Sequence, residues 1–284
     1  MMLKNSEILL TEPRGFCAGV ERAIEIVNRA VEIFDETIFV KHEVVHNKHV
    51  IEQLVKKGVI FVESLEAVPD QSILIYSAHG VSKEISELAT KKRLKVFDAT
   101  CPLVTKVHFE IHKFASQNID VVLVGHSGHP EVEGTMGQYI SEKGNIHLVE
   151  TNDDIDKLKI ENKNIAYVTQ TTLSVDDTKS IVSCLKNKFP NIIGPRKDDI
   201  CYATQNRQEA VKKILEFCDS LIVVGSQNSS NSQRLKEIGV QYGIKSYLID
   251  DINQINIDDL SSDKIIGITA GASAPEDTVA SLVK

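Results

Sequence analysis

The stretch CPLVTKVHFEIHKFASQNIDVVLVGHSGHPEVEG, residues 101–134, contains three patterns in succession. Apolar residues first recur at spacings of three and four, which is typical of an amphipathic helix. The β-branched run 120–124 then predicts a strand, and a polar loop rich in Gly and His follows it. A helix, a strand and a polar loop in this order indicate an α/β unit with a parallel sheet.

The same order occurs twice more along the chain. Each copy has a helical pattern that opens with a cysteine, then a strand-like run at 37–40 or 220–224, then the polar loop HEVVHNKH or GSQNSSNS. Self-similarity at a fixed offset indicates an internal repeat, although a common α/β rhythm could also place the cysteines by coincidence. The offsets are 29 residues from Cys17 to His46, 28 from Cys101 to His129 and 28 from Cys201 to Ser229.

Each copy also contains a second strand with a second polar loop, at 73–84, 165–177 and 265–277. The repeat predicts three α/β units, at 16–100, 101–197 and 198–284, with an N-terminal strand within 1–15 joining the sheet of the third. The segment 195–199 is the most linker-like. Ligands bind at the carboxyl ends of parallel strands, near helix N-termini. If the units meet around a pseudo-threefold axis, three cysteines and six loops converge on one central cavity.

Composition narrows the class of protein. A chain of 284 residues is too long for one small hydrophobic core. Its composition, with 42% hydrophobic and 25% charged residues, argues against a disordered protein and against a bundle of membrane helices. No run approaches the ~18 apolar residues of a spanning helix, and the N-terminus lacks the apolar core of a secretory signal, which predicts a cytoplasmic protein. The net charge of −8 disfavours binding to nucleic acid or to an anionic membrane.

Cys17, Cys101 and Cys201 are each expected at a helix N-terminus, a position that stabilises a thiolate. Three cysteines without a fourth in register indicate a metal centre with an open position, whereas a closed zinc site needs four ligands. Zinc with Cys₃His remains possible, although the chain has no CxxC. A 4Fe–4S cluster held by three cysteines would leave one iron open to substrate. Cys184 and Cys218 lie on apolar stripes and are expected in the core.

The loops carry hydrogen-bond donors and Gly backbone, a set suited to phosphate or diphosphate. The alternative for each loop histidine is a solvated turn residue, and this is the interpretation for the other six, His42, His49, His108, His112, His126 and His147. The candidate anion donors are His46, His79 and His129, with Ser229, Ser230, Asn231 and Ser273 in the third unit.

Glu131 is a carboxylate within a loop of donors. Facing a bound anion would raise the pKa of this carboxyl and make it a proton donor. The alternative is a first-turn Glu that satisfies helix N–H groups after Pro130. The segment TQTT, residues 169–172, offers hydroxyls that could relay a proton or hold a substrate alcohol.

Nine ordered segments resemble the LytB/IspH family of 4-hydroxy-3-methylbut-2-enyl diphosphate reductases: RGFCAGVERAI, VVHN, SAHGVS, DATCPLV, GHSGHPEVEGT, TQTTLSVDDT, CYATQNRQ, NSSNSQRL and TAGASAPE. The resemblance implies three α/β units around a central 4Fe–4S cluster held by Cys17, Cys101 and Cys201, whose fourth iron binds the substrate hydroxyl. It also implies that Glu131, His129 and Thr171 act in catalysis. The implied diphosphate-site residues are His46, His79, His129, Ser229, Ser230, Asn231 and Ser273, with Thr171 near the substrate alcohol.

The implied reaction is the last step of the non-mevalonate isoprenoid pathway, the reductive dehydroxylation that yields isopentenyl and dimethylallyl diphosphates. Because the chain lacks a G-x-G-x-x-G fingerprint, the electrons are expected from a separate protein, and the family implies ferredoxin or flavodoxin. One rival is a non-redox enzyme with a similar three-cysteine cluster, such as quinolinate synthase, whose carboxylate substrates would favour arginines in the pocket. The other is a zinc-stabilised binding protein without turnover.

Overall fold

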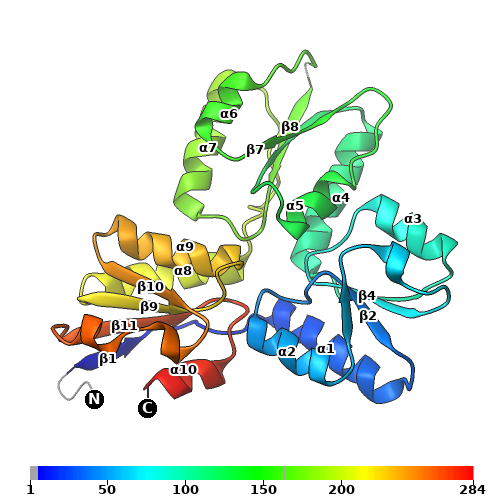
Figure 1. Ribbon diagram of the computed structural model, residues 1–284. Coiled ribbons are helices and arrows are strands. Elements are labelled where there is room, and N and C mark those ends of the chain that lie inside the picture. The colour runs from blue at the N-terminus through cyan, green and yellow to red at the C-terminus, as the bar shows by residue number, and fades with distance from the viewer. Residues whose placement is uncertain (1–5, 163, 284) are drawn as a thin grey trace. The chain divides into compact units, whose positions relative to one another are not determined.

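The computed structural model describes residues 6–162 and 164–283, which contain three parallel β-sheets with helices between the strands (Figure 1). This confirms the α/β class. Within the described residues, no helix combines the length and the apolar composition needed to cross a bilayer. The contacts divide the chain into two compact units. The first comprises 1–21, 46–53 and 202–284, and the second comprises 22–45 and 54–201.

The sheet of the first unit has the strand order β1-β11-β9-β10. Its N-terminal strand β1 pairs in parallel with β11, with Ile8 opposite Ile266, while residues 1–5 of the expected N-terminal segment lie outside the described part. The strands are β1 (Glu7–Leu10), β9 (Ser220–Val224), β10 (Lys245–Ile249) and β11 (Ile265–Ala270). The helical elements of this segment are α8 (Tyr202–Leu215), α9 (Ser230–Gln241), η2 (Ile252–Gln254), η3 (Ile257–Leu260) and α10 (Glu276–Val283).

The second unit contains the other two sheets, of which the first has the order β3-β2-β4-β5. All four side chains of β4 are buried, as expected of a central strand with both faces covered. The strands are β2 (Ile38–Lys41), β3 (Ile60–Val62), β4 (Ile73–Tyr76) and β5 (Lys95–Asp98). The helices of this stretch of chain are α1 (Ala18–Ile33), α2 (Lys48–Lys56), η1 (Leu65–Ala67) and α3 (Lys83–Lys91).

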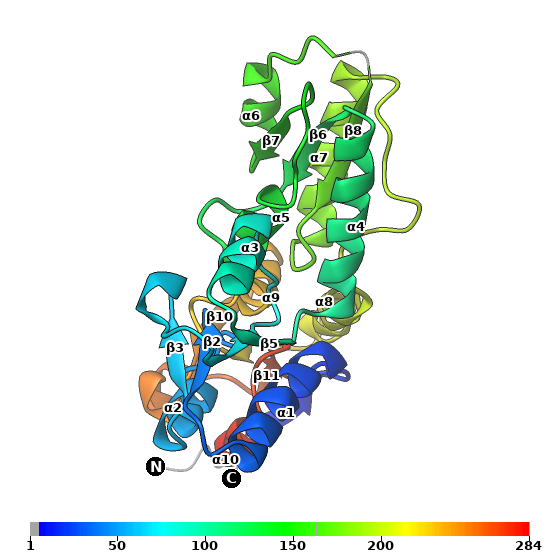
Figure 2. The same cartoon turned by 90° about the vertical axis from the view of Figure 1, so that its right-hand side faces the viewer.

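The remaining sheet has the order β7-β6-β8, with α4 and α7 on opposite faces (Figure 1, Figure 2). Alternate residues of β6 point to opposite faces, so Val121 and Leu123 pack in the core with α4, whereas Val122 and Val124 pack in the core with α7. Both faces are apolar, which explains the unbroken run VVLV. The elements are β6 (Asp120–Val124), β7 (Ile146–Val149), β8 (Ile165–Thr169), α4 (Pro102–Ser116), α5 (Pro130–Met136), α6 (Asn152–Lys157) and α7 (Val175–Lys188).

The division at 16–100, 101–197 and 198–284, and the pseudo-threefold axis that would relate these units, stay predictions. The structure adds that the three sheets are all parallel, so the polar loops follow the carboxyl ends of their strands, as ligand-binding loops do in α/β folds.

Candidate active site

The three candidate cysteines occupy equivalent local environments. Each immediately precedes the first residue of a helix, α1, α4 or α8. The backbone N–H of each donates to a carbonyl oxygen two residues beyond the end of a strand. The donor–acceptor distances are 3.1 Å from Cys17 to Ala272, 3.0 Å from Cys101 to Ala78 and 3.0 Å from Cys201 to Thr171.

These anchoring loops also carry candidate substrate residues. His79 follows Ala78, Ser273 follows Ala272, and Thr171 is itself an anchor. The same short loops therefore anchor the backbone of a cysteine and carry a polar candidate side chain. This regularity comes from the strand–loop–helix repeat, and each instance lies within a single compact unit.

Cys17 belongs to the first compact unit, whereas Cys101 and Cys201 belong to the second. All three side chains are partly exposed, and none of the five cysteines, all of which are described, forms a disulfide. Within residues 6–162 and 164–283, no group of three or more metal-binding side chains is already assembled. Joint metal ligation by the three cysteines therefore stays a prediction.

The second unit brings two candidate histidines together. The rings of His79 and His129 meet edge to face, with centroids 5.7 Å apart. His129 caps α5, and its Nδ1 accepts the N–H of Glu131 at 3.1 Å. Because Nδ1 is an acceptor, the neutral ring carries its hydrogen on Nε2, which makes that atom a donor suited to an anion. Nδ1 of His79 lies 3.2 Å from the hydroxyl of Ser77.

Glu131 lies in the first turn of α5, and only 4% of it is exposed. Burial raises the pKa of this carboxyl to about 7, although two hydrogen bonds from Thr171 act in the opposite direction. The backbone N–H of Thr171 donates to Oε1 at 2.7 Å, and its hydroxyl donates to Oε2 at 2.9 Å. The side chain is thus bonded to Thr171, 40 residues further along the chain, and the largest cause of its raised pKa is desolvation.

Thr171→Val is expected to raise the pKa of Glu131 further, by about one unit, because it removes one hydrogen bond to the ionised carboxylate. The midpoint can be followed by the infrared band of the protonated carboxyl, identified by its loss in Glu131→Gln. Thr172→Val is the matched control, because the hydroxyl of Thr172 bonds to Gln170. An unchanged midpoint in Thr171→Val would show that this hydroxyl does not act on Glu131.

Asp199 is a buried carboxylate, paired with the partly exposed Lys106, that sequence reasoning missed. The Asp199 side chain is 0% exposed, and its Oδ1 accepts from Lys106 Nζ at 2.9 Å. Its Oδ2 accepts the N–H of Thr169 at 3.0 Å, and its charge contributes to the raised pKa of Glu131. The linker-like composition of 195–199 gave no indication that Asp199 is buried and bonded in this way. The available signal was its position in the sequence, two residues before Cys201.

The first unit contains the other five candidates, and hydrogen bonds join three of them through the loop after β11. Ser273 Oγ donates to the carbonyl of His46 at 3.0 Å. Asn231, of which 3% is exposed, accepts the N–H of Ala272 at 2.9 Å and donates to the Thr204 hydroxyl at 3.3 Å. Ser229 caps α9, and Ser230 is the first residue of that helix. The loop after β11 is therefore bonded both to His46 and to the start of α9.

Gly80, next to His79, has a φ of +76°, and a Cβ there would lie 2.7 Å from Cε1 of His108. His108 lies buried in α4, so its interpretation as a solvated turn residue is wrong: the helical stripe turns it inward, and burial lowers its pKa to about 4. The close contact shows that Gly at position 80 is required for packing as well as for backbone conformation.

Gly80→Ala is expected to reduce the free energy of unfolding by more than Gly58→Ala does. Gly58 has a φ of +88°, but a Cβ there meets nothing within 4 Å, so this control carries only the backbone penalty of about 1–2 kcal/mol. Urea unfolding of the two variants measures the difference. Equal losses would show that the His108 contact costs nothing.

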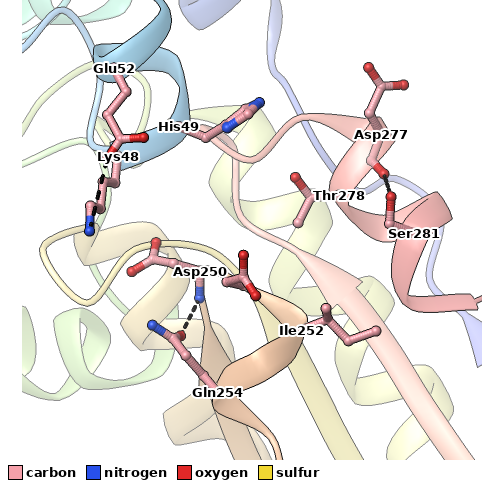
Figure 3. A pocket seen from close by; sticks show the side chains of 10 residues that line it. Lys48, His49, Glu52, Asp250, Ile252, Gln254, Asp277, Thr278 and Ser281 are labelled. Carbon is pink, nitrogen blue, oxygen red and sulfur yellow. Dashed lines mark hydrogen bonds and ion pairs between the residues drawn. The ribbon is translucent and has the colours of Figure 1, made fainter.

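A cavity of about 350 Å³ lies in the first unit, between the start of α2, the segment after β10, and α10 (Figure 3). It contains none of the candidate site residues. Its charged side chains have both signs, and two of them pair with each other, Lys48 with Glu52 at 3.9 Å. The lining residues are Lys48, His49, Glu52, Asp250, Asp251, Ile252, Gln254, Asp277, Thr278 and Ser281.

Comparison with known proteins identifies relatives along nearly the whole chain. The family model "LytB protein" matches residues 8–284. A 4-hydroxy-3-methylbut-2-enyl diphosphate reductase of Methylococcus capsulatus is 58% identical over 271 residues, which cover 95% of this chain and 87% of that protein. One from Aeromonas hydrophila is 57% identical over 277 residues, covering 97% and 89%.

Solved structures agree with these matches. The E-1-hydroxy-2-methyl-but-2-enyl-4-diphosphate reductase of Plasmodium falciparum superposes with a TM-score of 0.94 at 45% identity, covering 98% of this chain and 87% of that one. A second structure, titled as (E)-4-hydroxy-3-methyl-but-2-enyl diphosphate reductase, the terminal enzyme of the non-mevalonate pathway, has a TM-score of 0.70 at 31% identity and covers 98% of both chains.

Proposed function

Because the chain belongs to the LytB family, we propose that it is the enzyme that reductively removes the hydroxyl of 4-hydroxy-3-methylbut-2-enyl diphosphate. This is the terminal step of the non-mevalonate pathway. Two electrons and two protons break the allylic C–O bond. The oxygen leaves as water, and the carbon skeleton becomes isopentenyl or dimethylallyl diphosphate.

Cys17, Cys101 and Cys201 are the proposed ligands of one 4Fe–4S cluster. The donor set fits such a group, because three partly exposed thiols stand at the starts of three helices and share one backbone anchoring pattern. Three protein ligands would leave one iron of such a cluster available to substrate. When bound, the cluster supplies electrons and a Lewis-acid position for the substrate oxygen.

The diphosphate is held by hydrogen-bond donors from the polar loops. In the second unit these are His79 and His129, the latter through Nε2–H. In the first unit they are His46, Ser229, Ser230, Asn231 and Ser273. Hydroxyl, amide and imidazole groups can each point a hydrogen at a phosphate oxygen, which fixes the orientation of the substrate while its far end reacts.

Glu131 is the proposed proton donor, and its geometry is the observation that carries the chemical part of this proposal. A buried carboxyl with a pKa of about 7 is partly protonated at neutral pH, so it can give a proton to a leaving oxygen. The hydroxyl of Thr171, 2.9 Å from this carboxyl, is placed to orient the substrate alcohol toward it. His129 lies two residues from Glu131 and connects the proton donor to the diphosphate donors.

The electrons come from a separate protein, and ferredoxin or flavodoxin is the proposed donor. The three stretches 16–100, 101–197 and 198–284, the last joined by the N-terminal strand, are proposed to surround the reacting groups as three pseudo-threefold-related units. This arrangement would place six strand-end loops around one cavity, and the parallel sheets place those loops at the carboxyl ends of their strands.

The test is an anaerobic absorbance spectrum with iron and sulfide analysis, repeated with the hydroxylated diphosphate and followed by an assay with reduced flavodoxin. A brown protein with close to four irons, whose spectrum changes with this ligand and which forms the two products, supports the proposal. A colourless protein with one zinc and no turnover would overturn it.

A further inference from the structure

Arg207 is a buried cation that the proposed reaction does not use. It lies in α8, the helix that begins immediately after Cys201, and only 4% of it is exposed. Its Nη2 donates to the carbonyl oxygen of Gly15 at 2.5 Å and to that of Phe16 at 3.2 Å. Its Nη1 donates to the carbonyl of Ala203 in its own helix at 2.8 Å. The guanidinium therefore joins α8 to the loop that leads to Cys17.

The bond to Phe16 reaches the peptide group that Cys17 shares. The Phe16 carbonyl and the Cys17 N–H belong to one rigid, planar unit. Arg207 holds the oxygen of this unit, and the carbonyl of Ala272 accepts the N–H at 3.1 Å. The peptide is thus held at both of its polar atoms.

The other side of Cys17 is restrained as well, because its carbonyl accepts the N–H of Glu21 at 2.9 Å in the first turn of α1. With the backbone fixed on both sides, the direction of the thiol depends on rotation about its Cα–Cβ bond alone. The guanidinium uses both terminal nitrogens, Nη2 for the carbonyls of Gly15 and Phe16 and Nη1 for that of Ala203, and the single ammonium of lysine can reproduce this pattern only in part.

We propose that Arg207 is a positioning residue for Cys17: it fixes the backbone that carries this thiol and places a buried positive charge one peptide group away from this proposed metal ligand. This inference rests on the proposed function. Partners that orient a metal ligand contribute strongly to metal retention, and a nearby cation favours the electron-rich state of a redox centre.

The test compares Arg207→Gln and Arg207→Lys with the wild-type chain, each purified anaerobically with its metal. Release of iron to a chelator is expected to be about 10-fold faster in Arg207→Gln, because the peptide loses one of its two anchors. The reduction midpoint, followed by electron paramagnetic resonance, is expected to shift to lower potential in Arg207→Gln. In Arg207→Lys, iron release is faster than in the wild type, but the midpoint stays near the wild-type value because the charge remains.

Arg14→Gln is the matched control. It removes a guanidinium from the same loop, one that bonds to Thr11 and Glu276 and makes none of its described bonds to the Phe16–Cys17 peptide. Its iron release is expected to equal that of the wild type. Wild-type iron release and midpoint in both Arg207 variants would overturn the inference while leaving the reductase proposal intact.

A second measurement covers the remaining outcomes. If Arg207→Gln fails to fold, Arg207→Lys alone decides through its rate of iron release. If the wild-type protein carries no iron, the reductase proposal fails, and alkylation of Cys17 in the protein as purified still tests the positioning role. Faster alkylation of Cys17 in Arg207→Lys than in the wild type, with an unchanged rate at Cys184, supports that role. Wild-type alkylation rates at both cysteines in Arg207→Lys would refute it.

Discussion

Glu131→Gln is expected to lower turnover by about 10²- to 10⁴-fold while leaving the cluster and substrate binding unchanged. The amide fills the same buried space and can still bond to Thr171, but it has no acidic proton to deliver. Single-turnover measurement with reduced protein separates the chemical step from binding. In the wild type, the rate of this step is expected to fall as pH rises through about 7, since Glu131 then loses its proton.

Glu133→Gln is the matched control for this prediction. Glu133 lies in the same short helix, two residues further on, but its side chain is exposed. The variant removes an equal charge close to the site and should retain wild-type turnover and pH dependence. Full turnover in Glu131→Gln, or an equal loss in both variants, would remove Glu131 from proton delivery.

Cys201→Ser is expected to abolish stable cluster binding and to lower activity by at least about 100-fold. A serine hydroxyl keeps the size of the side chain but is a poor ligand for iron compared with a thiolate. The backbone bond from residue 201 to Thr171 is preserved, so the fold around α8 should persist. Iron analysis, the visible spectrum and thermal unfolding of the same preparation measure these three properties.

Cys184→Ser provides the comparison, because Cys184 is also partly exposed but lies in α7 and packs against the hydrophobic core. This variant should keep its iron and its activity. A Cys201→Ser protein with a full iron content and an unchanged spectrum would exclude Cys201 as a ligand.

Local patterns were enough to locate many strands. The runs 120–124 and 220–224 were predicted at the bounds where β6 and β9 occur, and the run 37–40 is shifted by one residue from β2, which spans 38–41. A strand covered on both faces must be apolar throughout, so its pattern is visible in a single sequence. The helix starts after Cys17, Cys101 and Cys201 were equally visible, because each is followed at once by a helical apolar spacing.

Local sequence patterns predicted the candidate site only in part. Residue types and their repeat singled out the cysteines, the loop histidines and Glu131. The raised pKa of Glu131 was expected from a bound anion, whereas in the structure its cause is burial. Asp199 was concealed by a charged, linker-like stretch, although its carboxylate is fully buried.

The sequence by itself therefore determined the α/β class, the parallel sheets and the residue types of the candidate site, because hydrophobic periodicity and helix starts act over a few residues. Only the tertiary structure decided which hydrogen-bond partners these residues have. Thr171 is 40 residues from Glu131, and Arg207 is 192 residues from Gly15. Burial and hydrogen bonding depend on which distant segments pack together, and these contacts set the protonation of Glu131 and hold the peptide of Cys17.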